Sequence, residues 1–136
     1  MDAYCTWRVF VSLLFLALTM CAMPVSTAYQ LSFDEAVSRA EGAQGDPAQG
    51  APYARDMTKP LNTAFLNATV RCTQMSPGRS ESFNYVLQIE EDGRIGAVYV
   101  DSPTDHSACI QRALRRKRLP KPPIAPYFAR GSHSIN

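Results

Sequence analysis

Apolar residues recur along the chain with two different periods, which predict two kinds of element. Between residues 61 and 72 they fall at helical spacing and form one stripe along a helix. Between residues 83 and 90 apolar and polar residues alternate, which predicts a half-buried strand. A second strand, rich in Val, Ile and Tyr, is predicted over 95–100, and Asp92-Gly93 between the strands is a strong signal for a tight turn. The pattern therefore predicts a helix followed by a β-hairpin, 83–100.

A shorter helix and a connector are predicted before this region. Ser32 and Glu35 have the spacing of a capping box, and the helix that begins there is expected to stop at Gly42. Residues 42–52 are rich in Gly, Pro and Ala and have no hydrophobic period, so we interpret them as a linker or loose loop. Residues 29–52 are thus expected to hold a short helix and a linker that precede the main domain.

The hairpin is expected to lie between two further helices. The first is predicted over 53–72, where Pro60 is either a kink or the first-turn residue of the final part. The second follows a turn at 101–105, carries its apolar residues on one stripe and is ended by Pro120. Residues 127–129 favour a third strand. The predicted fold class is α+β, with a small antiparallel sheet of two or three strands, flanking helices and one disulfide.

Residues 1–28 have the organisation of a signal sequence. An apolar run over 9–20 is broken by Pro24, and small residues favour cleavage after Ala28. Two alternatives remain. An uncleaved leader would anchor the chain in a membrane, and a lipoprotein would be modified at Cys21, although the preceding methionine is not the small residue that such a site requires. We expect a periplasmic or secreted protein whose remaining residues, about 108, suit one small domain.

Export leaves two cysteines in the mature chain, Cys72 and Cys109. Two cysteines in an oxidising compartment usually pair, and this bridge would close a loop of about 38 residues, which corresponds to about 4 kcal/mol of stabilisation. Both lie on the apolar stripes of helices that flank the hairpin, so they can meet if the helices pack on one face of the sheet. A reactive or metal-binding thiol pair is the alternative, but the two cysteines lack CxxC spacing.

Charge is distributed unevenly along the chain. Residues 29–105 hold six basic and eleven acidic residues, net −5, whereas residues 106–136 hold seven basic and no acidic residues, net +7. One interpretation is a solvated helix end whose cations complement the helix dipole, and the other is a docking surface for an anionic envelope surface or an acidic protein. Nucleic acid is not an expected partner, because no aromatic residues are interleaved. The basic cluster consists of Arg112, Arg115, Arg116, Lys117, Arg118 and Lys121.

Several short motifs occur in series across residues 83–123. They are Tyr85-Val86-Leu87-Gln88-Ile89, Asp92-Gly93-Arg94-Ile95, Val98-Tyr99-Val100-Asp101-Ser102, Cys109-Ile110-Gln111-Arg112-Ala113-Leu114 and Leu119-Pro120-Lys121-Pro122-Pro123. In this series the chain resembles the C-terminal domain of TonB-type energy transducers and the Cys-containing variants found in myxobacterial motility and gliding proteins. Those variants also carry a cysteine in a helix before the hairpin, as Val70-Arg71-Cys72 does here.

The resemblance implies a TonB-C-like α+β domain over 53–136 that binds other envelope proteins. The chain departs from a transducer in three respects: its leader has a cleavage site, its spacer is at most about 25 residues long, which spans about 85 Å when extended, and the Tyr-Pro motif that commonly opens the family's domain is absent. The resemblance therefore implies an interaction module and not energy transduction.

Candidates for catalytic chemistry are few. The chain has two histidines, His106 and His133, and the HxxC spacing of His106 and Cys109 has no second ligand pair beside it. No nucleotide-binding, hydrolase or metalloprotease motif occurs, so we assign no catalytic residue, metal site or cofactor. The hypothesis is an exported, non-enzymatic protein-interaction module of the bacterial envelope. The alternatives are a small secreted enzyme or enzyme inhibitor, and a membrane-anchored structural component of the envelope.

Overall fold

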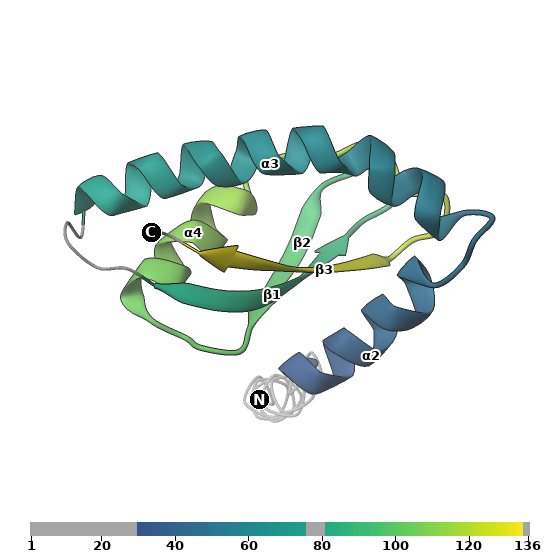
Figure 1. The fold of residues 1–136 in the computed structure, drawn as a ribbon, viewed down its shortest axis with the longest axis horizontal. Coiled ribbons are helices and arrows are strands. Elements are labelled where there is room, and N and C mark those ends of the chain that lie inside the picture. The colour runs from purple at the N-terminus through teal and green to yellow at the C-terminus, as the bar shows by residue number, and fades with distance from the viewer. Residues whose placement is uncertain (1–29, 76–80, 135–136) are drawn as a thin grey trace, which may run out of the picture. The chain divides into compact units, whose positions relative to one another are not determined.

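The computed structural model describes residues 30–75 and 81–134, and the predicted signal sequence over 1–28 lies outside them. Within these ranges the chain forms an α+β unit with three helices, a three-stranded antiparallel sheet and one disulfide (Figure 1). None of the described helices is long and apolar enough to cross a membrane. The predicted fold class is confirmed at this level.

The first described helix, α2, spans Phe33–Gln44 and begins with the predicted capping box. The Ser32 hydroxyl accepts a hydrogen bond from the backbone N–H of Glu35 (3.2 Å), and the Glu35 carboxylate accepts one from the N–H of Ser32 (2.8 Å). The helix does not stop at Gly42 as expected, because an exposed glycine inside a helix costs only about 1 kcal/mol and does not end it by itself.

The prediction of a linker over 42–52 is wrong in its extent. Only residues 45–49 separate α2 from the next helix, α3, which spans Gly50–Met75. Asp46 explains the early start, because its carboxylate accepts the N–H groups of Ala48 (2.9 Å) and Gln49 (3.3 Å), which precede the first turn of α3. The segment rich in Gly, Pro and Ala therefore contains only a short turn, and the residues on either side of this turn belong to the two helices.

Pro60 lies inside the continuous helix α3, so it is not a first-turn residue. The buried residues of α3 follow the predicted apolar stripe and reach Cys72, which is 1% exposed. They are Gly50, Tyr53, Met57, Leu61, Ala64, Phe65, Ala68 and Cys72.

The strands confirm the predicted hairpin and the third strand. β1 spans Ser82–Ile89, β2 spans Ile95–Val100 and β3 spans Tyr127–Ser134, in the order β2-β1-β3 with antiparallel pairing throughout. β3 is longer than the predicted 127–129 because all eight of its residues pair with β1. At the hairpin turn Gly93 has a φ of 82°, a conformation that favours glycine.

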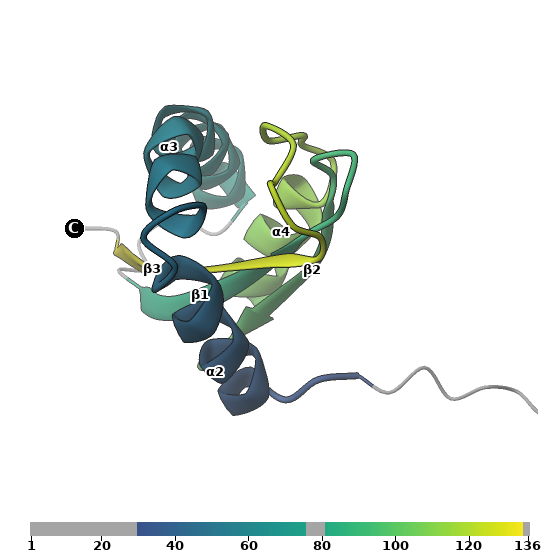
Figure 2. The ribbon, with the colours of Figure 1, turned by 90° about the vertical axis from the view of Figure 1, so that its right-hand side faces the viewer.

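Both faces of the sheet are covered. The last helix, α4, spans Asp105–Leu114 and packs with α3 on one face, while α2 lies on the other, as Figure 2 shows. The main core lies between the sheet and the α3–α4 layer, and the smaller core of Ala36, Ala40, Val86 and Phe128 lies under α2. Because α3 and α4 share a face, Cys72 and Cys109 meet with their Cα atoms 5.9 Å apart, and the predicted disulfide is confirmed.

Candidate partner-binding surfaces

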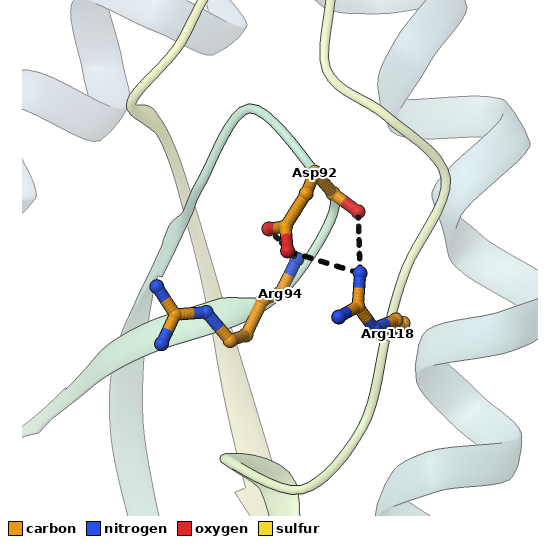
Figure 3. A network of polar contacts seen from close by, with 3 residues as sticks. All are labelled: Asp92, Arg94 and Arg118. Atoms are coloured by element: carbon orange, nitrogen blue, oxygen red, sulfur yellow. Dashed lines mark hydrogen bonds and ion pairs between the residues drawn. The ribbon is translucent and has the colours of Figure 1, made fainter.

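The residues of the basic cluster predicted from the sequence differ in their contacts, and Arg118 forms an ion pair. Its guanidinium donates to the carboxylate of Asp92 (2.9 Å) and to the Asp92 carbonyl (3.4 Å) at the tip of the hairpin (Figure 3). The backbone N–H of Arg94 also donates to Asp92 (3.0 Å), while the Arg94 side chain points away. This N–H and the nearby charges of Arg118 and Arg94 hold the pKa of the Asp92 carboxyl below its usual value.

Arg115 and Lys121 do not line the groove between α3 and α4 that the remaining members of the cluster line. Helix α4 ends at Leu114, so only Arg112 lies in its last turn and Arg115 follows as the C-cap. Burial raises the pKa of Tyr99 in β2, and the positive charges of Arg39 and Arg115 partly offset this increase. Lys121 is exposed in the segment between α4 and β3.

The other members of the cluster line a groove between α3 and α4. Arg112 and Arg116 line one part of it, and Arg116 and Lys117 line the next, with Arg71 and Ala113 common to both. Arg71 is not a member of the cluster predicted from the sequence, because it lies 41 positions before Arg112 on another helix. The signal was the disulfide itself: Arg71 adjoins Cys72, so a bridge to α4 brings it beside that helix.

The second candidate surface is the free edge of β3. The N–H of Asp101 donates to the carbonyl of Asn84 (3.2 Å). The even-numbered residues of β1 therefore direct their backbone N–H and C=O groups toward β2, and the odd-numbered residues direct theirs toward β3. Because Tyr85 is paired with Gly131, the odd-numbered residues of β3 direct their backbone N–H and C=O groups toward β1. The even-numbered residues of β3 therefore direct their backbone N–H and C=O groups away from the sheet.

This edge is blocked at one end and open at the other. Near α2 the outward N–H of Arg130 donates to the side-chain oxygen of Gln44 (3.3 Å). Beyond it, the carbonyl of Arg130 and the backbone groups of Ser132 have no hydrogen-bond partner among the residues that the structure describes. The opposite edge of the sheet is partly closed, because Leu119 donates its N–H to the carbonyl of Gly93 (2.8 Å).

A groove of about 430 Å³ runs beside the open edge of β3, below α3. Leu66 lines it from α3 and is 64% exposed, one of four large apolar side chains left exposed in the described chain. The groove is lined by Asn62, Phe65, Leu66, Thr69, Tyr85, Ser132, His133 and Ser134. A second groove, on the α2 side, also reaches Ser132. A strand laid along this edge would direct alternate side chains to the two faces on which these grooves lie.

The two histidines lie near each other at the same corner of the fold. His106 is buried, and neither ring nitrogen has a hydrogen-bond partner in the described chain. The His133 Nε2 atom lies within hydrogen-bond distance of Thr69 Oγ1 (3.2 Å), and burial, with the charge of His106, lowers the His133 pKa. Cys109 is held in the disulfide, and the described residues contain no group of three or more His, Cys, Asp or Glu that could hold a metal ion.

Comparison of the chain with protein-family models, with curated proteins and with solved structures found no match.

Proposed function

We propose that the chain is an exported, periplasmic module of the bacterial envelope that performs no catalysis and binds another envelope protein. Binding occurs through an extended segment of the partner, which adds as a strand to the open edge of β3. The TonB-like series of motifs over 83–123 supports this proposal, since that kind of domain pairs with partner segments. The disulfide supports export, because such bridges persist in oxidising compartments.

The unpaired backbone of β3 is the observation that carries the proposal. An edge strand with free N–H and C=O groups is a template for pairing, and proteins that do not use such an edge usually protect it. Here one end is protected by the Gln44 side chain, while the end at Ser132 is open. Ser132 also lines the groove below α3, so backbone pairing and side-chain recognition would occur at one place.

A pair of exposed apolar residues on α3 provides a matched test. Leu66 and Val70 lie one helical turn apart and are 64% and 53% exposed, but only Leu66 lines the groove. A photo-crosslinking amino acid is placed at one position or the other in the full exported chain, which is then exposed to envelope extract. We expect a crosslinked protein from position 66 and much less from position 70, with the crosslink mapping to one short segment of the partner.

The crosslinked segment is then tested as a synthetic peptide. Ser132→Pro removes the outward N–H without touching a bond to β1, whereas Ser132→Ala retains that N–H. The peptide should bind the wild-type chain and Ser132→Ala with similar affinity, and bind Ser132→Pro about fivefold or more weakly, as expected for one lost hydrogen bond and an obstructed edge. Equal binding to all three chains, or equal crosslinking from positions 66 and 70, would contradict strand addition at β3.

A further inference from the structure

The groove between α3 and α4 gathers positive charge that no acidic side chain balances. Arg71 comes from α3, and Arg112 and Arg116 come from α4 and the residues after it. In the described part of the chain none of the three guanidinium groups belongs to an ion pair, whereas Arg118 and Arg130 each do. No Asp or Glu lines this groove. Like charges held together without counter-charges cost free energy, and an anion placed among them removes that cost.

The disulfide fixes the two sides of this groove. Arg71 directly precedes Cys72, and Arg112 lies three positions after Cys109, so each arginine is anchored beside one end of the bridge. With the two Cα atoms held 5.9 Å apart, the arginine-bearing backbones of α3 and α4 cannot separate. Such preorganisation lowers the entropy cost of ordering the arginines when a ligand binds.

Several of the residues that line the groove are small. Ala113 lines both parts, Cys109 lines one and Ala68 lines the other, and the two parts have volumes of about 120 and 210 Å³. These volumes suit a single compact group and exclude a folded element. The planar guanidinium group donates two parallel hydrogen bonds to an oxyanion, and several of them around one site match the several oxygens of a phosphate.

We propose that the α3–α4 groove is a binding site for a phosphate group, held by Arg71, Arg112 and Arg116 with Lys117 at its far end. A dianionic phosphate balances more of this charge than one carboxylate does, which favours it over an acidic protein side chain. The groove has no lining residue in common with the groove beside β3, so either proposal can fail while the other holds.

Inorganic pyrophosphate and phosphate are the first probes, titrated into the isotope-labelled exported chain at constant ionic strength. Saturable shifts of backbone amides around Arg71 and Arg112 are expected. Arg71→Gln and Arg112→Gln should each weaken binding about tenfold, the effect of removing one charged hydrogen-bond donor. Arg115→Gln lowers the net charge equally but lies outside the groove, so it should change the affinity less than twofold. Shifts that do not saturate, or an equal loss in Arg115→Gln, would overturn the proposal.

Vesicles distinguish the source of the phosphate group. Phosphatidylcholine vesicles are compared with vesicles that also contain phosphatidylglycerol, with pyrophosphate as competitor. Retention on the anionic vesicles that pyrophosphate reverses and Arg71→Gln abolishes supports a lipid headgroup, and pyrophosphate binding without vesicle retention supports a soluble phosphorylated ligand. Tighter binding of a polyglutamate peptide than of pyrophosphate, lost equally in Arg71→Gln, would overturn the proposal in favour of an acidic protein.

Reduction of the disulfide tests the role of the bridge in the groove without changing any charge. The reduced chain retains Arg71, Arg112 and Arg116, but their spacing is no longer fixed, so its affinity for pyrophosphate should fall several-fold while its circular dichroism spectrum remains folded. An unchanged affinity in a folded, reduced chain would contradict preorganisation by the bridge. If reduction unfolds the chain, Arg71→Gln and its control Arg115→Gln still decide the proposal.

Discussion

At Gly93 the turn of the hairpin lies directly against the segment that follows α4. The Gly93 φ of 82° is strained for any residue with a Cβ, and a Cβ there would collide with the backbone carbonyl of Leu119. The two residues are also joined by the hydrogen bond from the Leu119 N–H to the Gly93 carbonyl (2.8 Å). We expect Gly93→Ala to lower the free energy of unfolding by about 1–3 kcal/mol, measured by urea denaturation.

Gly42 provides the control for this substitution. It lies exposed inside α2, and nothing lies within 4 Å of the place where its Cβ would be. Gly42→Ala should therefore raise the free energy of unfolding by up to about 1 kcal/mol, because alanine loses less backbone entropy in a helix. A stabilising or neutral effect of Gly93→Ala would show that the turn does not require the left-handed conformation.

At the scale of elements, α3, β1, α4 and β3 converge on His133. Its ring packs against those of Phe65 (5.4 Å between ring centres) and Phe83 (5.2 Å), and its Nε2 lies 3.2 Å from the hydroxyl of Thr69. Burial first, and then the charge of His106, lower the pKa of His133. The folded state therefore binds this proton less readily than the unfolded state, for which the pKa is about 6.5.

This shift predicts a loss of stability in mild acid. The contribution of neutral His133 is fully present above a pH of about 6.5, and it falls as the pH drops from there through the lower pKa of the folded state. Urea midpoints between about pH 7.5 and 5 should therefore decrease more in the wild-type chain than in His133→Gln, which does not titrate. Parallel pH dependence in the two chains would show that His133 does not contribute to it.

How far the sequence predicts these elements depends on whether their signals are local. The capping box at Ser32 and the Asp92-Gly93 turn depend on neighbouring residues, and both were predicted. The last part of β3, 130–134, has no alternation of apolar residues, and it is a strand because the whole of β1 pairs with it. Arg71 was missed for the same reason, since its place in the groove depends on how α3 packs against α4.

At the scale of the whole described fold, the sheet has a helical layer on each face, and the disulfide belongs to only one of them. It joins α3 to α4, whereas α2 is held over the other face by the contacts of its alanines with Val86 and Phe128 and by the ion pair of Glu41 with Arg130. Exposed ion pairs contribute little, so the apolar contacts carry most of the stability of α2. The covalent constraint and the α2 layer therefore lie on opposite sides of the sheet.

The bridge should account for a large share of the stability of this fold. It closes a loop that contains the whole hairpin and the first half of α4, and for a sequence separation of 37 the chain-entropy model gives about 4 kcal/mol. Domains of this size have about 5–15 kcal/mol in total. We expect the urea midpoint to fall strongly when the wild-type chain is reduced, and the m-value to rise, because the unfolded chain then exposes more surface.

Cys72→Ser with Cys109→Ser separates the cross-link from the reducing agent. Because Cys72 is fully buried, its serine variant also loses apolar packing, so this double variant should be less stable than the reduced wild-type chain by about 1 kcal/mol or more. If the bridge acts mainly on the unfolded chain, the oxidised chain should be the most stable of the three forms. The reduced chain should be less stable, and the double variant should be the least stable. Equal midpoints for the oxidised and reduced chains would instead mean that packing alone holds α3 against α4.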